Sequence, residues 1–497
     1  MFTFYDVVLW LIVFVVVSSI YWYMTIPKNL PPGPVGLPFL GSSLYYWDGS
    51  KQHLILSENV KKYGPIFKLY IANKLVVVLG TYELIQEAIV KQGDVYAGRP
   101  ELQSFVPDKI KRLGVINSEG DLWKEQRRFA LSTLRDFGVG RPIIEPRIKE
   151  EIEYMSERIT EYAITGKPFN PQRLVTCAVS NIINQLLFGR RLSYDDEEFV
   201  RQCMEMTRRV SGDGISFLSP LILSETMATL ASLLPIGRKM KAEADDFLDF
   251  VESEMKQTMS TFDSDFEPNN YIHAFMKAAS SIQGESYFTN AQLLSTCNDL
   301  FQAGTETTAT TTRWAILYLA HHQEVQEKLH QEIKNQVGTS SLPSYADRVK
   351  LPFAEAVVME TQRISDLVPL GVLRRTLAPT KLMGYDIPPD TLVVPLLTNI
   401  LHNPDVYPEP LRFNPGRFID ANGKVIRDPK LIPFQAGKRV CLGEPLARME
   451  LFLFLVGLVS RFRFYFPSDR IRPSTKPIVG FTCTPVPYEV CVETRND

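Results

Sequence analysis

One ten-residue stretch near the C-terminus constrains this chain more than any other feature of its sequence. Residues 434–443 read FQAGKRVCLG, and a long apolar segment with proline at its second position follows directly. Proline is well tolerated in the first turn of a helix, and the unpaired amides and the dipole of that turn stabilise negative charge just ahead of it. Cys441 stands there, between Gly437 and Gly443, which permit tight turns or close backbone approach. The pattern favours a metal-bound thiolate at Cys441.

The stretch resembles the haem-binding signature F-x-x-G-x-R-x-C-x-G of the cytochrome P-450 haem-thiolate monooxygenases at every fixed position. The fixed residues are Phe434, Gly437, Arg439, Cys441 and Gly443. The resemblance implies that Cys441 binds the iron of haem (iron protoporphyrin IX) and that the other four residues form the cofactor loop. Thiolate ligation of haem favours oxygen activation over oxygen storage. For an isolated cysteine, the alternative is a buried apolar side chain ahead of a helix.

A second stretch lies midway along a predicted helix over residues 290–321. Residues 303–308 read AGTETT and resemble the oxygen-activating A-G-x-[DE]-T-[TS] stretch of the same family. The resemblance implies that Thr307 and Glu306 are catalytic and order the waters that deliver protons. The alternative is that Thr307 only bonds its own backbone and Glu306 forms a structural ion pair. Glycine and clustered threonines weaken a helix, so the sequence predicts a local kink or widened turn here.

Further residues match the family's cofactor contacts. Trp123 and Arg127 lie one turn apart on a predicted helix and resemble the W-x-x-x-R contact to the haem propionates. Buried carboxylates need cationic or N–H donors. The donors that the resemblance implies are Trp123, Arg127, Arg374 and Arg439. Arg374 stands where relatives often carry histidine.

Glu360 and Arg363 are spaced to pair on one helical face. Most such pairs are solvated and contribute little to stability. This pair nevertheless resembles the family's E-x-x-R motif, which joins an arginine from a later segment, here Arg417. The resemblance implies a structural role for Glu360, Arg363 and Arg417.

The helix of Trp123 also carries a basic stripe. Lys124, Arg128 and Arg135 fall within about 40° of one another around a helix. A solvated charged face is the default interpretation. If the helix covers the proximal side of the haem, as in the family, the stripe docks an acidic NADPH-dependent flavoprotein reductase, with cytochrome b5 as a further partner.

By resemblance, the substrate chamber is lined mainly by apolar residues. Its predicted members are Phe301, Ala303, Leu370, Val372 and Phe481. Such a chamber suits a hydrophobic small molecule that is held by shape. The sequence offers no second anchor, such as an inward-facing arginine for a substrate carboxylate. Fatty acids, terpenoids, steroids, xenobiotics and aromatic precursors all remain candidate substrates.

The N-terminus carries a charge-free run from Val7 to Pro27, about the 20 residues that a helix needs to cross a bilayer. The run lacks the features of a cleaved signal peptide, so a retained anchor is predicted over residues 1–27, with a buried core helix as the alternative. A hinge rich in Pro and Gly follows over residues 28–41, and residues 42–497 form the predicted haem-thiolate monooxygenase domain. Lysines after the run favour a cytosol-facing domain. The chain resembles the animal microsomal branch of the family, which implies the endoplasmic reticulum membrane.

Helical signals dominate the rest of the sequence. The predicted fold is mostly α with minor β, a cytochrome P-450 fold with an N-terminal transmembrane anchor helix. Two short strands are expected around a turn at Asn73-Lys74, and a further strand near residues 392–397. Long helices are expected over residues 145–163, 175–188, 240–259, 290–321, 323–336, 352–364 and 444–462.

Composition excludes several function classes. The 497 residues include 54 Lys and Arg against 56 Asp and Glu, and the net charge of -2 gives no overall footprint for nucleic acid. The six cysteines lack the density and the CxxC pairing of a disulfide framework or zinc site. No Gly-rich dinucleotide fingerprint follows a strand, so electrons must come from another protein.

The resemblance as a whole implies a haem-dependent monooxygenase. It would insert one atom of O2 into a hydrophobic small molecule, by hydroxylation or epoxidation, with electrons from NADPH through a separate reductase. Two alternatives stay open: a haem-dependent isomerase or dehydratase that acts on a peroxide in its substrate, and a non-catalytic haem-binding sensor. The intact acid–alcohol pair and the unaltered cysteine loop argue against both.

Overall fold

The computed structural model describes residues 48–100, 106–211, 225–281, 287–467 and 471–495, together with scattered residues ahead of position 48. Helices make up most of this part of the chain, so the predicted mostly α fold with minor β is confirmed. The helices are α2 (Gln52–Tyr63), α3 (Tyr82–Ile85), α4 (Gly120–Asp136), α5 (Glu145–Thr165), α6 (Gln172–Leu187), α7 (Glu197–Val210), α9 (Glu225–Ser232), α10 (Pro235–Met259), α11 (Tyr271–Ser281), α12 (Asn290–His321), α13 (Gln323–Gln336), α14 (Pro352–Ser365), α15 (Thr398–Leu401) and α16 (Glu444–Arg461).

The strands form one larger sheet and several two-stranded ribbons. The larger sheet has the order β1-β2-β6-β3, in which β2 pairs parallel with β6 and the other neighbours pair antiparallel. The strands are β1 (Ile66–Ile71), β2 (Lys74–Leu79), β3 (Arg374–Arg375), β4 (Thr380–Leu382), β5 (Tyr385–Ile387), β6 (Leu392–Pro395), β7 (Phe462–Tyr465), β8 (Pro477–Val479), β9 (Cys483–Pro485) and β10 (Cys491–Thr494).

The β1–β2 hairpin turns one residue earlier than the sequence predicts. Ile71 pairs with Lys74, so the turn consists of Ala72 and Asn73. Ala72 takes the left-handed conformation, with φ of 50°. Most side chains of both strands are buried, on both faces of the sheet, so burial alone does not select the position of the turn.

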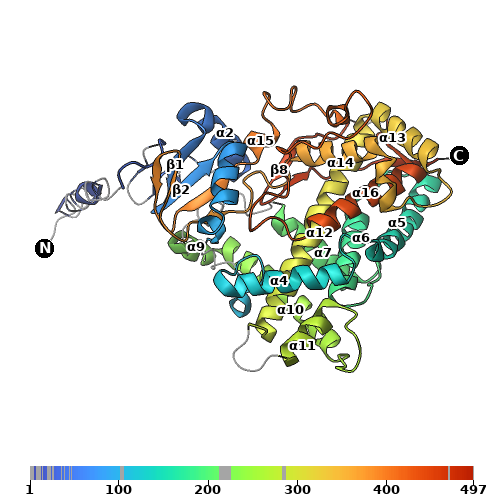
Figure 1. The fold of residues 1–497 in the computed structure, drawn as a ribbon, viewed down its shortest axis with the longest axis horizontal. Helices are drawn as coiled ribbons and strands as arrows, with labels where there is room; N and C mark the ends of the chain where they lie inside the picture. The colour runs from blue at the N-terminus through green and yellow to red at the C-terminus, as the bar shows by residue number, and fades with distance from the viewer. Residues whose placement is uncertain are drawn as a thin grey trace.

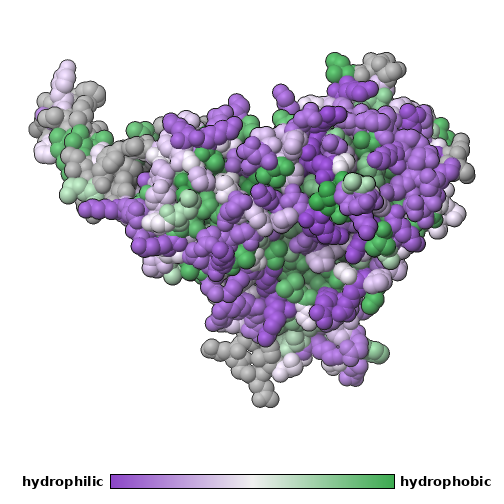
Figure 2. Space-filling model, turned by 45° about the horizontal axis from the view of Figure 1, so that its top comes forward, coloured by the Kyte–Doolittle hydropathy of each residue, from purple (hydrophilic) through white to green (hydrophobic). Residues whose placement is uncertain are grey.

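The helix α12 forms the centre of the helical body, between the end that holds β1, β2 and α2 and the end that holds α5 and α13 (Figure 1). It packs against α6, α14 and α16. A Cβ added at Gly304 would lie only 2.6 Å from Cδ1 of Ile183 on α6, so this glycine permits close packing of two helices. Apolar side chains gather around these helices, and the face of the molecule in Figure 2 is mainly hydrophilic.

The predicted anchor over residues 1–27 falls largely outside the described residues. Those that are described between Tyr5 and Met24 are helical, and the side chains of Trp10, Val13 and Val17 among them are exposed. Within the described ranges, no helix combines the length and the apolar character needed to cross a bilayer. The anchor therefore stays a prediction.

Candidate active site

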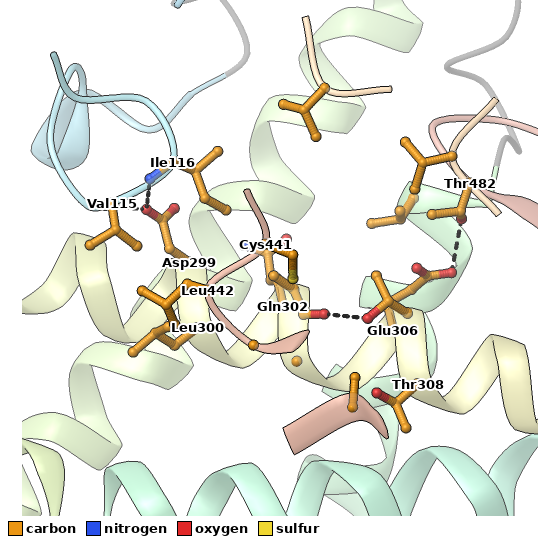
Figure 3. A pocket seen from close by; sticks show the side chains of 18 of the residues that line it. Val115, Ile116, Asp299, Leu300, Gln302, Glu306, Thr308, Cys441, Leu442 and Thr482 are labelled. Atoms are coloured by element: carbon orange, nitrogen blue, oxygen red, sulfur yellow. Dashed lines mark hydrogen bonds between the residues drawn. The ribbon is translucent and has the colours of Figure 1, made fainter. Parts of the chain in front are cut away.

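A cavity of about 600 Å³ lies between the middle of α12 and the loop that precedes α16. Figure 3 shows that Cys441 borders the same space as Gln302 and Glu306 of α12. Cys441 is exposed, whereas the other five cysteines of the chain are buried. The cysteine that the sequence singles out is thus the one whose thiol is open to the cavity.

The loop before α16 is closed by its own backbone. The N–H of Cys441 donates to the carbonyl of Phe434 at 3.1 Å. Gly437 has φ of 74°, and a Cβ there would lie 2.2 Å from the carbonyl oxygen of Ile89, so no larger residue fits. At Gly443, by contrast, nothing lies within 4 Å of an added Cβ, and the residue borders the cavity.

The start of α16 sets the electrostatics of Cys441. The thiol is open to the cavity but lies deep inside the protein, and the resulting desolvation is the largest influence and raises its pKa. The backbone N–H groups of Gly443 and Glu444 and the charge of Arg127 lower it. Nη2 of Arg127 also donates to the carbonyl of Val440 at 2.6 Å. The first turn of α16 therefore directs N–H groups at the sulfur, as the helix dipole argument requires.

Arg439 and Trp123 form one stacked unit beside this loop. The guanidinium carbon of Arg439 lies 3.8 Å from the centroid of the Trp123 ring. Nε of Arg439 donates to the carbonyl of Ala97 at 3.0 Å, and Nη2 donates to the carbonyl of Ser118 at 2.7 Å. Nε1 of Trp123 is buried and has no acceptor in the part of the chain that the structure describes.

Arginines accumulate around this unit and repel one another. The members of this arginine cluster are Arg99, Arg127, Arg374 and Arg439. Burial and mutual repulsion lower the pKa of Arg439 to about 8 and that of Arg99 to about 10, and bring the pKa of Arg374 well below its usual value. Arg374 donates through Nη2 to Oε1 of Gln435 at 3.0 Å, but its Nε has no acceptor among the described residues. The cluster is a buried concentration of positive charge that is short of acceptors.

Glu306 of α12 is a buried carboxyl group at the cavity. Its Oε1 accepts a hydrogen bond from Thr310 at 3.0 Å, and the residue is 1% exposed. The same oxygen accepts from Thr482 at 2.9 Å, as Figure 3 shows. Burial raises the pKa of this carboxyl, and the two hydrogen bonds and the charge of Arg313 oppose that shift. A buried carboxyl with a raised pKa beside a cavity is able to hold and release a proton.

Thr307 borders the same cavity. Its hydroxyl donates to the carbonyl of Ala303 at 2.8 Å, and Thr311 bonds the carbonyl of Thr307 in the same way. No widened turn interrupts α12, which is described over its whole length and α-helical throughout, and the kink stays a prediction. These hydroxyl groups share carbonyls that already belong to the helical ladder, and packing against α6 supports the helix around Gly304.

A second group of buried charges lies apart from the residues that border the cavity. Oε2 of Glu360 accepts from Nε of Arg363 at 2.7 Å, and Oε1 accepts from Nη2 at 2.9 Å. Nε of Arg417 lies 3.1 Å from Oε2 of Glu360, and the N–H of Asn414 donates to Oε1 at 2.9 Å. The side chains of Glu360 and Arg363 are fully buried. The residues that the sequence assigns to a structural role are thus in contact.

Comparisons with known proteins agree with this geometry. The family model for cytochrome P450 matches residues 31–492. The chain is 40% identical to cytochrome P450 2H2 of Gallus gallus over 465 residues, which covers 93% of this chain and 92% of the relative. It is 37% identical to cytochrome P450 2J1 of Oryctolagus cuniculus over 471 residues, covering 94% of this chain and 92% of the relative. It is 36% identical to cytochrome P450 2D26 of Rattus norvegicus over 473 residues, covering 94% of this chain and 93% of the relative. The chain belongs to the cytochrome P450 family.

Membership of the cytochrome P450 family establishes the class of reaction. The chain is a haem-dependent monooxygenase, an oxidoreductase that takes electrons from NADPH through a separate reductase. The predicted resemblance to animal microsomal members is confirmed by the relatives from chicken, rabbit and rat. None of these comparisons favours the peroxide isomerase or the sensor.

The residues of this cytochrome P450 fit its cofactor. Haem carries two propionate carboxylates, and the arginine cluster offers buried charge together with two donors without acceptors, Nε1 of Trp123 and Nε of Arg374. The cavity of about 600 Å³ reaches Cys441 and Gly443 and leaves room for a large cofactor beside the sulfur. Both the charge and the shape of the site therefore suit haem.

Two residues predicted to line the substrate chamber lie elsewhere. Phe301 is fully buried and packs against Phe247, with ring centroids 5.6 Å apart. Successive residues turn by about 100° on a helix, so Phe301 and Ala303 face roughly opposite directions. Leu370 packs against the apolar side chains around the larger sheet. Ala303, Val372 and Phe481 do border the cavity.

Sequence reasoning missed three residues of the site. Arg99 joins the arginine cluster, and its Nη1 donates to the carbonyl of Leu373 at 2.7 Å. Thr482 bonds the catalytic candidate Glu306 from a distant segment. Glu450 borders the cavity from α16, where burial raises its pKa to about 8. These residues lie outside the motifs, and only the fold brings them to the cavity.

Proposed function

We propose that this chain is a membrane-anchored haem-thiolate monooxygenase in which Cys441 is the iron ligand. The observation that carries this proposal is one exposed thiol just before α16, which shares a cavity with Glu306 and lies beside a cluster of four arginines that lower one another's pKa. When bound, haem supplies the oxygen-activating chemistry that places one oxygen atom in the substrate. Trp123 and the arginine cluster hold its propionates, and Phe434, Gly437 and Gly443 shape the loop around it.

Glu306 and Thr307 are proposed to supply protons on the substrate side of the cavity. Glu306 keeps one carboxyl oxygen without a partner among the described residues, and Thr482 holds the other. The raised pKa of Glu306 favours the protonated acid. Thr307 presents a hydroxyl at the cavity one residue further along α12, where it can order a water.

The chain is further proposed to face the cytosol from the endoplasmic reticulum membrane. Residues 1–27 would anchor it, residues 28–41 would form the hinge, and residues 42–497 would form the catalytic domain. The exposed apolar side chains of Trp10 and Val17 support an environment of lipid around the first segment. Leu230, Leu233 and Leu234 are also exposed, and they are proposed to form a second apolar contact with the membrane.

The proposed electron donor is an NADPH-dependent flavoprotein reductase that docks on α4, with cytochrome b5 as a further partner. Lys124, Arg128 and Arg135 are exposed on this helix. Trp123 and Arg127 face inward from the same helix and contact the cysteine loop or Arg439. A charged surface so close to the cofactor contacts would favour rapid encounter with an acidic partner.

The ligand assignment is tested by the absorption spectrum of the reduced carbonyl complex. Cys441→Ala should abolish the thiolate-type band, whereas Cys177→Ala, which alters a buried cysteine away from the cavity, should retain it. With reductase and NADPH, the unaltered protein should place one atom of labelled O2 in an apolar product. A thiolate band that persists in Cys441→Ala would refute the ligand.

The proposed role of Thr307 in proton delivery is tested by how fully NADPH consumption is coupled to product formation. Thr307→Ala should bind haem normally but divert reducing equivalents to hydrogen peroxide, which is measured as the ratio of peroxide to NADPH consumed. Thr311→Ala, whose hydroxyl makes the same backbone contact one turn further on, is the matched control. Fully coupled turnover in Thr307→Ala would remove this residue from the proposal.

A further inference from the structure

Arg209 places a charged group in the wall of the cavity where the sequence predicts no anchor. It lies in the last turn of α7 and borders the cavity together with Val210, Met240 and Ala244, the last two from α10. The N–H of Phe481 donates to the carbonyl of Val210 at 3.0 Å. The end of α7 is therefore joined to Phe481, and the residue after it, Thr482, donates a hydrogen bond to Glu306.

The guanidinium group of Arg209 is only partly satisfied. Its Nη1 donates to the backbone carbonyl of Glu243 at 3.2 Å, and its central carbon lies 5.1 Å from the centroid of the Phe247 ring. Nε and Nη2 are buried, and neither has a hydrogen-bond partner among the residues that the structure describes. Leaving such donors unpaired is costly, and the cost is larger for a charged group.

The carboxylates near Arg209 are already engaged with other arginines. They are Glu243 with Arg208 at 2.5 Å, Asp246 with Arg201 at 2.9 Å and Glu205 with Arg201 at 3.1 Å. Burial is the largest influence and lowers the pKa of Arg209, while the charges of Glu243, Glu205 and Asp246 oppose that shift. Arginine keeps its charge in proteins. These three carboxylates therefore lie near Arg209, but among the described residues none forms an ion pair with it.

The two unpaired atoms form the edge of the guanidinium that binds a carboxylate in two parallel hydrogen bonds. Two other arginines of this chain use the same edge. Arg363 binds Glu360 through Nε at 2.7 Å and Nη2 at 2.9 Å, and Arg190 binds Glu254 through Nε at 3.0 Å and Nη2 at 2.5 Å. Arg209 has the same two donors unpaired and buried in the wall of the cavity, with no protein carboxylate bound to them among the described residues.

We infer that Arg209 is a substrate-anchoring residue that selects apolar substrates bearing a carboxylate. The inference rests on the proposed function and narrows its substrate class to apolar carboxylic acids. The carboxylate would pair with the Nε and Nη2 edge between α7 and α10. The apolar body would then extend along Val210 and Met240 toward Ala303 and Thr307, so that carbon atoms remote from the carboxylate reach the site of oxidation.

The test compares dodecanoate with dodecan-1-ol, which share a chain length and differ in charge. The haem-loaded full chain is titrated with each, and dissociation constants are read from the optical shift of the haem and, independently, by calorimetry. The unaltered protein should bind dodecanoate more tightly than the alcohol. Arg209→Gln should weaken dodecanoate binding about tenfold or more, because hydrogen bonds to charged groups are strong, and should change alcohol binding less than about twofold.

The matched control is Lys239→Gln, which removes one positive charge from α10. Lys239 is 68% exposed and lies 3.9 Å from Glu243, so dodecanoate binding should stay within about twofold of that of the unaltered protein. Arg209→Lys should retain part of the preference for the acid, since it keeps the charge but not the two-donor edge.

Several outcomes would overturn the anchor. In the first, the unaltered protein binds dodecanoate and dodecan-1-ol equally well. This comparison uses no variant, so it holds even if Arg209→Gln does not fold. Arg209→Gln could weaken both ligands equally, which would show a structural role, or Lys239→Gln could match its effect, which would show a general effect of charge. Loss of the thiolate-type carbonyl band in the unaltered protein would instead refute the proposed function, so the two failures are distinguishable.

Discussion

The molecule contains two groups of buried arginines, and they differ in whether their charge is balanced. In one group, Glu360 accepts hydrogen bonds from Arg363 and Arg417, and the pair Glu360–Arg363 is fully buried. In the arginine cluster beside the cysteine loop, guanidinium groups face mainly backbone carbonyls and one another. In the first group a carboxylate pairs with both arginines, whereas in the second Nε of Arg374 has no acceptor among the described residues.

This difference separates residues that hold the fold from residues that hold a ligand. A buried charge that loses its partner is strongly destabilising, so a complete group supports the fold by itself. An incomplete group lowers stability until an anionic ligand arrives. In the proposed function, the two propionates of haem balance the arginine cluster. Arg209, which also borders the cavity, has unpaired donors of the same kind.

The largest expected effect comes from breaking the complete group. Glu360→Gln leaves two arginines without a counter-charge and should lower the free energy of unfolding by about 3–5 kcal/mol, with or without haem. Chemical denaturation of both forms measures this. Glu409→Gln, which removes an exposed partner of Arg412, should cost less than about 1 kcal/mol. Equal losses in the two variants would contradict the distinction between the groups.

Breaking the incomplete group should have opposite consequences in the two forms of the protein. Arg374→Gln removes an uncompensated charge, so the free energy of unfolding of the haem-free protein should not fall by more than about 1 kcal/mol. In the loaded protein, the same change should speed the transfer of haem to an acceptor protein about tenfold. A loss of haem-free stability as large as that of Glu360→Gln would show that Arg374 serves the fold.

Glu450 is a buried carboxyl group that, like the arginine cluster, has an unpaired polar atom. Its Oε1 has no partner among the described residues, and burial raises its pKa from 4.5 to about 8. Because the folded pKa lies above the unfolded value, the folded state retains a proton that the unfolded state loses, and stability falls as pH rises between about 5 and 8. Glu450→Gln should flatten this fall in denaturation curves, whereas exposed Glu267→Gln should not. An unchanged slope would mean that Glu450 is ionised in the folded protein.

The smallest effect is expected at Trp123. Trp123→Phe keeps a ring beneath Arg439 but removes the Nε1 donor that has no acceptor among the described residues. Haem transfer should quicken severalfold, in line with one neutral hydrogen bond, while haem-free stability should change by less than about 1 kcal/mol. Unaltered transfer kinetics would exclude Trp123 as a propionate donor.

Much of the site could be predicted because its motifs are local. The loop from Phe434 to Gly443 and the pair Glu306–Thr307 each lie within one short stretch. The bounds of α12 and α13 follow from apolar periodicity, and Thr289 caps the start of α12. The predicted widened turn around Gly304 is not formed, because propensity ignores the neighbouring helix: Ile183 of α6 fills the space that a side chain would need. Phe301 was misplaced although helical geometry separates it from Ala303.

The sequence by itself determined the family, the cysteine beside the helix start and the mostly helical fold, because each depends on residues close together in the chain. Only the tertiary structure decided which charges are balanced. Arg99 and Arg439 come from opposite ends of the chain, and Arg209 lacks a carboxylate only because its neighbours bind Arg201 and Arg208. Charge balance depends on distances through space, and those distances are set by how the helices pack.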